Sequence, residues 1–249
     1  MAQNPDLIVA LGTTAAQSLV KPTKDNPIPV VFASITDPVG AKLVQDLNHP
    51  GSNFTGTSNF IPIEPQLAFY KAIKPSIKNL GIIYNPGEAN SVRLVSDFTS
   101  LAKQQGITIQ TMTVNRTADV KQAASSLAYK VDAFLITNDN TTLSAIPAIV
   151  SIGFFAHLPV FASDTDTLDS GVTAAIGPNQ YRLGQQTGRM IDKILKGEKP
   201  QNLPVEFPEV IDMRLNEAAA EKIGLHFSDE LRQKAANTQK TTATGNPNP

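Results

Sequence analysis

The chain has 249 residues, of which 41% are hydrophobic and 17% are charged. At about 150 residues per domain this length allows one large domain or two small ones, and the apolar content excludes a disordered or fibrous chain. Its 21 Lys and Arg residues are balanced by 22 Asp and Glu residues, so the excess of basic charge that is typical of nucleic-acid binders is lacking. There is no cysteine, which excludes disulfides, iron–sulfur clusters, Cys-ligated zinc and cysteine nucleophiles.

The two ends differ from the rest of the sequence. Residues 1–6 (MAQNPD) have neither the basic nor the apolar region of a signal peptide, and no stretch of the chain is apolar enough to span a membrane. Residues 235–249 (AANTQKTTATGNPNP) are polar and punctuated by Pro and Gly. This composition predicts a disordered tail.

Between the ends, short apolar runs alternate with amphipathic stretches. The runs are residues 6–11 (DLIVAL), 29–35 (PVVFASI), 80–84 (LGIIY), 133–136 (AFLI), 159–162 (PVFA) and 172–176 (VTAAI). Nearly continuous apolar runs of this length are typical of parallel strands that are covered on both faces. The alternation with helices predicts an α/β fold with parallel sheets.

Two of the amphipathic stretches have clear helical spacing. In residues 91–105 the apolar side is expected to contain Val92, Val95, Phe98 and Leu101. In residues 180–196 it is expected to contain Leu183, Thr187, Met190, Ile191 and Leu195.

A polar cluster follows each apolar run. The clusters are residues 12–14 (GTT), 36–38 (TDP), 85–91 (NPGEANS), 138–142 (NDNTT), 164–166 (DTD) and 177–179 (GPN). Ligands of open parallel sheets bind at the carboxyl ends of the strands, where helix N-termini also attract anions. Ser, Thr, Asp and Asn are equally the preferred N-caps of helices, so any one of them is explained by capping alone. The clusters 85–91 and 138–142 hold more polar side chains than caps require, which favours a ligand site.

One motif suggests an enzyme. Residues 160–168 (VFASDTDTL) imitate the DxDxT motif of haloacid-dehalogenase-type phosphatases, in which Asp164 would be the nucleophile and Asp166 the general acid beside Mg²⁺. The motif normally opens such a chain, and no strand followed by paired acids comes after it here. An EF-hand loop is excluded because Asp169 stands where Gly is needed and Ala175 where Glu is needed.

Other catalytic and cofactor motifs are absent from the sequence. No Walker A, GxGxxG or GxSxG pattern occurs, and His49, His157 and His226 have no metal-ligand neighbours at suitable spacing. We therefore expect no catalytic residue, no metal and no cofactor. The residues present are sufficient for a binding protein.

Several segments together resemble one family. DLIVALGTTAAQS, PVVFASITDPVGAKLV, PGSNFTGTSNF, YNPGEANSV, VDAFLITNDNT, PVFASDTDTLDSGVTAAIG and YRLGQQTGRMIDKILKGEKP occur in order between Pro5 and Leu231. They are similar to the ABC-transporter substrate-binding family that includes the tryptophan/tyrosine/phenylalanine-type binding lipoproteins. The resemblance implies a type I periplasmic-binding-protein fold, in which two Rossmann-like parallel-sheet lobes are joined by a hinge around a ligand cleft.

The resemblance also implies domain boundaries. Residues 1–60 and 172–199 would form the first lobe, residues 61–171 and 200–234 the second, and residues 235–249 a disordered tail. The hinge would include residues 57–62, 171–177 and 200–208. Relatives begin with a lipoprotein signal peptide and two βα units, about 60 residues, before the equivalent of DLIVALG. We therefore expect the first lobe to be incomplete, with an exposed apolar sheet edge.

For a zwitterionic ligand, the cleft must offer donors to a carboxylate and acceptors to an ammonium group. The carboxylate candidates are Thr13, Thr14, Ser58 and Ser91, and the ammonium candidates are Asp37, Glu88, Asp139, Asp164 and Asp166. Asn85, Asn90, Asn138 and Asn140 suit either end, and Thr36 completes the set. Phe60 and Tyr84 are candidates for an apolar wall around an aromatic ligand, or else core or hinge residues.

The expected function is solute capture for an ABC importer, with an amino acid as the ligand and the aromatic amino acids among the candidates. The implied partners are this ligand and an ABC permease, with no nucleic acid, and membrane attachment only through a lipid anchor outside this chain. The protein is expected to be a monomer in the periplasm or at the cell surface. A ligand-sensing domain of the same fold, as in sugar-responsive repressors, and the Mg²⁺-dependent phosphatase stay open as alternatives.

Overall fold

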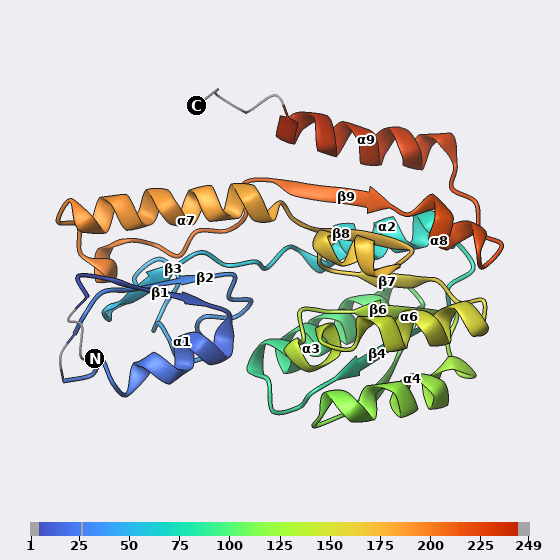
Figure 1. Cartoon of the computed structure of the whole chain (residues 1–249), viewed down its shortest axis with the longest axis horizontal. Coiled ribbons are helices and arrows are strands. Elements are labelled where there is room, and N and C mark those ends of the chain that lie inside the picture. Colours follow the sequence, from blue (N-terminus) through green and yellow to red (C-terminus); the bar gives the residue numbers. More distant parts are fainter. Residues whose placement is uncertain (1–4, 26, 244–249) are drawn as a thin grey trace. The chain divides into compact units, whose positions relative to one another are not determined.

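The computed structural model describes residues 5–25 and 27–243 (Figure 1). The chain divides into two compact units: unit 1 is Met1–Ile61 with Pro178–Val210, and unit 2 is Pro62–Gly177 with Ile211–Pro249. The chain therefore passes between the units after Ile61, Gly177 and Val210. Among the described residues, no helix is both long and apolar enough to cross a membrane.

Unit 1 contains a three-stranded parallel sheet of order β1-β2-β3. Its elements are β1 (Ile8–Leu11), α1 (Thr13–Val20), β2 (Val30–Ala33), β3 (Phe54–Gly56), α7 (Gln180–Leu195) and the 3₁₀ helix η3 (Pro200–Asn202). The central strand β2 is buried along its whole length, because Val30 and Phe32 pack into one apolar cluster and Val31 into another with Met190 of α7. On β1, in contrast, Val9 and Leu11 are exposed.

Unit 2 contains a six-stranded sheet of order β5-β4-β6-β7-β8-β9. The strands are β4 (Asn79–Tyr84), β5 (Thr108–Thr113), β6 (Ala133–Ile136), β7 (Val160–Ala162), β8 (Ala174–Pro178) and β9 (Ile211–Leu215). The pairs from β5 through β8 are parallel. The helices are α2 (Ile63–Ile73), α3 (Ala89–Gln104), η1 (Thr117–Asp119), α4 (Val120–Ala128), α5 (Asn140–Leu143), α6 (Ile146–Phe155), η2 (Thr165–Ser170), α8 (Glu217–Glu221) and α9 (Asp229–Ala243).

The core of unit 2 lies on both faces of this sheet. On one face, Phe134, Ile136 and Val160 pack against α4 and α6. Elsewhere in the unit Tyr70 of α2 stacks on Phe161 of β7, with 4.7 Å between ring centroids, and its hydroxyl donates a 3.0 Å hydrogen bond to the carbonyl of Ala162. Complete burial raises the pKa of the Tyr70 hydroxyl.

Three expectations from the sequence differ from this arrangement. β8 pairs with β7, so residues 172–177 belong to unit 2, and residues 200–210 belong to unit 1. The predicted disordered tail begins too early, since α9 continues to Ala243. This helix is held to the sheet by buried Leu231 and Ala235 and by Thr238, whose hydroxyl accepts a 3.1 Å hydrogen bond from the backbone N–H of Met213. Residues 244–249 lie outside the described part.

The buried faces of the two predicted amphipathic helices also differ in detail. In α3, Leu94 and Ala102 are buried with Val95 and Phe98, whereas Val92 is exposed. In α7, Ile194 is buried and Leu195 is exposed. In both helices apolar residues are adjacent in sequence, so more than one set of them could form the apolar side. The position of the sheet decides which set is buried against it.

Candidate functional site

The strongest concentration of polar contacts in unit 2 lies where β4 and β6 end. These strands are parallel neighbours, with Ile82 opposite Leu135, so their carboxyl ends meet at one edge of the sheet. The loop after β4 leads into α3 and the loop after β6 leads into α5. This edge is where an open parallel sheet binds its ligands.

Asp139 joins these two loops. Its fully buried carboxylate accepts a 2.7 Å hydrogen bond from the backbone N–H of Asn85. It also accepts a 2.7 Å hydrogen bond from the backbone N–H of Thr142 and so caps the N-terminus of α5. The Asn85 amide donates to the hydroxyl of Thr141 (2.9 Å) and its carbonyl accepts from the N–H of Gly87 (2.9 Å). Asp139, which the sequence analysis proposed as a partner for a ligand ammonium group, thus has both carboxylate oxygens hydrogen-bonded to the protein.

Glu88 makes a second connection between the same loops. Its carboxylate accepts hydrogen bonds from the backbone N–H and side-chain amide of Asn140, at 2.9 and 2.6 Å, and from the backbone N–H and hydroxyl of Thr141, at 3.0 and 2.8 Å. Charge-assisted bonds of this kind are the strong ones, so Glu88 fixes the start of α5 beside the start of α3.

Three polar atoms next to these connections are buried and have no hydrogen-bond partner among the described residues. They are Oδ1 of Asn90, Oγ of Ser91 and Oγ1 of Thr137. The Asn90 amide nitrogen does bond, to the backbone carbonyl of Asn138. Buried polar groups are nearly always satisfied, so such unpaired atoms require a partner that the described residues do not supply, either ordered water or a polar ligand. We call Asn90, Ser91 and Thr137 the exit cluster.

The exit of β7 lies at the same edge, because Ile136 and Ala162 are paired in the parallel sheet. Asp164 caps η2 by accepting a 2.9 Å hydrogen bond from the backbone N–H of Asp166, whose own side chain is exposed. Ser163 is buried and donates to the side-chain carbonyl of Gln66 (2.8 Å). Asp164 therefore has a capping role.

In unit 1, the five candidate residues follow the three parallel strands at their carboxyl ends. Thr13 is buried at the start of α1, and Thr14 beside it is exposed. Thr36 donates a 2.9 Å hydrogen bond to the side chain of Asn59, which connects the segments after β2 and β3. Asp37 accepts from the N–H of Gly40 (2.9 Å), and the buried Ser58 accepts from the N–H of Phe60 (3.0 Å). All five are at one edge of the unit 1 sheet.

Sequence reasoning missed Thr137, Thr141, Asn59 and Gln66. Thr141 belongs to the cluster 138–142 that was singled out. Thr137 lies just before that cluster and is the first polar residue after the apolar run 133–136, which is a signal that was present. Asn59 and Gln66 carried no such signal, because their partners are distant in the sequence. The two proposed aromatic residues, Phe60 and Tyr84, are half-buried.

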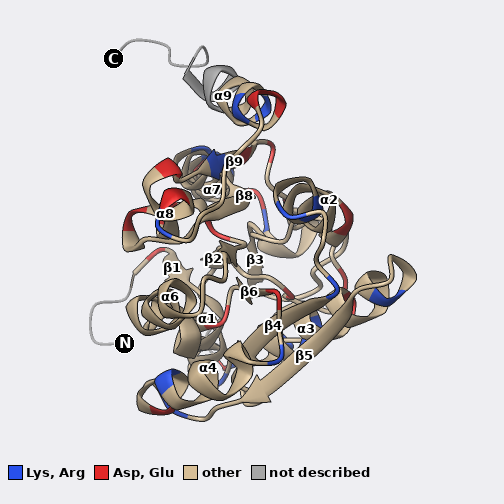
Figure 2. Cartoon of the chain, turned by 90° about the vertical axis from the view of Figure 1, so that its right-hand side faces the viewer, with Lys and Arg blue, Asp and Glu red and all other residues tan. Residues whose placement is uncertain are grey.

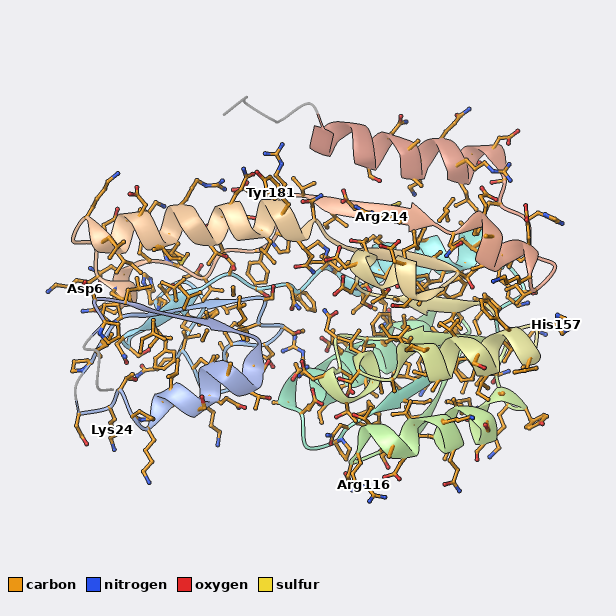
Figure 3. All side chains as sticks on the ribbon, viewed as in Figure 1. Asp6, Lys24, Arg116, His157, Tyr181 and Arg214 are labelled. Carbon is orange, nitrogen blue, oxygen red and sulfur yellow. The ribbon has the colours of Figure 1, made fainter. Side chains whose placement is uncertain are left out.

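Charged and potentially metal-binding side chains are distributed over the described residues of both units. Lys and Arg are scattered among Asp and Glu in the view of Figure 2. Within residues 5–25 and 27–243, no three His, Asp or Glu side chains are grouped as metal ligands. His157 follows α6 in unit 2 and points away from the ribbon (Figure 3).

Comparison with known proteins agrees with this geometry. The family described as ABC transporter substrate binding protein matches residues 1–239. The chain belongs to this family. It is 32% identical over 217 residues to a tyrosine-binding protein of Clostridioides difficile strain R20291, and the match covers 87% of this chain and 62% of that protein. The chain thus spans less than two thirds of that relative's length.

Two solved structures share the fold of this family member. A conserved domain protein of Vibrio cholerae is 38% identical with a TM-score of 0.90, and the match covers 94% of this chain and 78% of the other. An ABC domain from Streptococcus pneumonia in complex with L-Trp is 36% identical with a TM-score of 0.89, covering 94% of this chain and 79% of the other. The expected type I periplasmic-binding-protein fold is confirmed.

Proposed function

We propose that the chain is the solute-binding component of an ABC importer and that it binds an aromatic amino acid. The exit cluster is the observation that carries this proposal, because it presents unpaired buried polar atoms at the edge of a parallel sheet. The family supports solute binding, and the relatives named for tyrosine and crystallised with L-Trp support the ligand class.

The chemistry of the exit cluster suits a zwitterion. Ser91 lies in the first turn of α3, where its hydroxyl and the positive end of the helix favour a carboxylate. The Asn90 carbonyl and the Thr137 hydroxyl are acceptors for an ammonium group. Neutral partners suffice here, because the ligand carries both charges and brings no net charge.

In this proposal, Asp139 and Glu88 are positioning residues. Each carboxylate is bonded to donors from the neighbouring loop. They hold the two loops at fixed separation, so that the exit cluster is preorganised and binding orders fewer groups. The remaining candidates, Asn138 and Asn140 in unit 2 and Thr13, Thr14, Thr36, Asp37 and Ser58 in unit 1, stay candidates for further contacts to the ligand.

The same proposal extends to partners and location. The loaded protein would deliver its ligand to an ABC permease, act as a monomer outside the cytoplasm, and reach the membrane through a lipid anchor outside this chain. It would bind its ligand without making or breaking a bond. The phosphatase alternative receives no support from Asp164, whose carboxylate caps η2.

The test is a calorimetric panel on the whole chain. L-Trp, L-Tyr and L-Phe are titrated beside L-arabinose and two truncated analogues, tryptamine without the carboxylate and indole-3-propionate without the ammonium group. At least one aromatic amino acid should bind, with both analogues weaker by about tenfold or more for each lost charged contact. Absence of binding by all three amino acids, or tighter binding of the sugar, would overturn the proposal.

A further inference from the structure

A cavity in unit 2 is formed by different elements from those that hold the exit cluster. It has a volume of about 500 Å³ and is lined by Val150, Ser151, Phe154, Phe155, Ser170 and Lys222 among others. These residues come from α6, from the end of η2 and from the C-cap of α8. Figure 1 labels α6 and α8. The volume is within the range of about 300–1,000 Å³ that is typical of small-molecule sites.

The end of η2 packs closely against α6. Gly171 has φ +94°, and a Cβ there would lie 3.1 Å from Cγ1 of Val150 and 3.8 Å from Cζ of Phe154. A glycine is therefore needed for the chain to turn against α6, and this turn places Ser170 at the cavity. Phe155 is 83% exposed. An exposed phenylalanine at the rim of an apolar cavity is a typical feature of a binding surface.

The polar groups of the cavity are one cation and two hydroxyls. Nζ of Lys222 lies 5.2 Å from the ring centroid of Phe154, over its face. No ion pair of Lys222 is found in the described part of the chain, and the hydroxyls of Ser151 and Ser170 have no hydrogen bond there. The cavity thus combines an apolar wall with an unpaired positive charge and two free donors.

We propose that this cavity binds a small apolar carboxylate, such as an arylalkanoate, as a second ligand. The carboxylate would bond to Lys222 and to a serine hydroxyl, and the apolar body would lie against Phe154 and Phe155. Charge complementarity selects the anion, since an uncharged apolar molecule gains nothing from the ammonium group. A free α-amino group is disfavoured, because its positive charge would lie close to that of Lys222 with no carboxylate among the lining side chains to offset it. The site is independent of the proposed amino-acid site.

The test uses the ¹⁵N-labelled whole chain and two probes, 4-phenylbutyrate and its uncharged counterpart 4-phenylbutan-1-ol, followed by ¹H–¹⁵N correlation spectra. The acid should shift the amide signals of Ser151, Ser170 and Lys222 with a dissociation constant in the millimolar range, and it should bind about threefold more tightly than the alcohol. Shifts confined to residues 137–142, or no shift at the cavity, would overturn the proposal.

Two substitutions separate the charge from the apolar wall. Lys222→Met should reduce the affinity for the acid to that for the alcohol, and Phe155→Ser should weaken both. Lys103→Met, which removes an exposed lysine of α3 outside the cavity, is the matched control and should change neither. Equal affinity of the Lys222→Met variant and the original chain for the acid would contradict the proposal. Calorimetry with L-Trp on the same variants reports separately on the exit cluster.

Discussion

The carboxylate of Asp139 accepts a 2.7 Å hydrogen bond from the backbone N–H of Asn85 and so ties the end of β6 to the end of β4. Its second oxygen caps α5 through the N–H of Thr142. This fully buried side chain therefore joins the two loops of the proposed site, beside the second connection that Glu88 makes.

Replacement of this carboxylate should be costly. Asp139→Ala leaves two backbone N–H groups without their charged acceptor, so the free energy of unfolding should fall by about 3 kcal/mol. Urea unfolding followed by circular dichroism measures it. The control is Asp97→Ala, which removes an exposed ion pair with Arg93 and should cost about 0.5 kcal/mol or less. Similar losses for the two variants would show that Asp139 has no structural role.

Asp132 predicts a dependence of stability on pH. Burial raises the pKa of the Asp132 carboxyl. Hydrogen bonds from the backbone N–H groups of Lys78 and Asn79, together with the charge of Lys74, lower this pKa by more, so that the net pKa lies below the usual 3.8. Since the folded pKa is the lower one, this stabilisation is present above pH 3.8 and is lost as the pH falls through the folded pKa.

The test compares Asp132→Asn with the original chain by urea unfolding between pH 2.5 and 7, values chosen to lie about one unit or more on either side of the usual Asp range. At pH 7 the variant should be less stable by about 1 kcal/mol. The difference should shrink toward the acid end. A difference that does not change with pH would contradict the assignment.

Tyr70 should not ionise in the folded protein over the usual tyrosine range. Because complete burial raises the pKa of its hydroxyl, the alkaline absorbance titration of Tyr70→Phe should superimpose on that of the original chain until unfolding begins. The variant loses the hydrogen bond to Ala162, worth about 1 kcal/mol. A smaller absorbance change in the variant below the unfolding pH would show that Tyr70 is accessible.

Two glycines of unit 1 should respond in opposite directions to alanine. At Gly56 in β3 a Cβ would lie within 3 Å of both the carbonyl and the ring of Phe32, so Gly56→Ala should destabilise the protein by several kcal/mol. At Gly188 in α7 a Cβ would meet nothing within 4 Å, so Gly188→Ala should stabilise by about 0.5–1 kcal/mol. Melting temperatures decide this, and a stabilised Gly56→Ala would contradict the packing of β3 on β2.

Strands covered on both faces could be predicted from the sequence, and so could the edge strand β1 from its apolar run, but β3 and β5 could not. β2 and β6 are buried at every residue, so their apolar runs are continuous and unambiguous. β5 has the sequence TIQTMT with no fully buried residue, and β3 has only FTG. Both are held in place by backbone pairing with a buried neighbour, which leaves little trace in side-chain pattern.

For the candidate site, the loops could be predicted and the individual roles could not. The surplus of polar residues after β4 and β6 indicated the loops in which the exit cluster lies. However, Glu88 and Asp139 are bonded across residues more than 50 positions apart. Their role in connecting the two loops depends on the tertiary structure. For this reason the sequence analysis could assign them only as hydrogen-bond acceptors available to a ligand.

The most direct test of the central claim is the affinity of exit-cluster variants for the aromatic amino acid that the original chain binds best. In calorimetry, Ser91→Ala and Thr137→Val should each weaken binding by about tenfold, while Ser126→Ala, at an exposed serine of α4, should leave it unchanged. If both exit-cluster variants bind as tightly as the Ser126→Ala control, the ligand does not lie at the ends of β4 and β6.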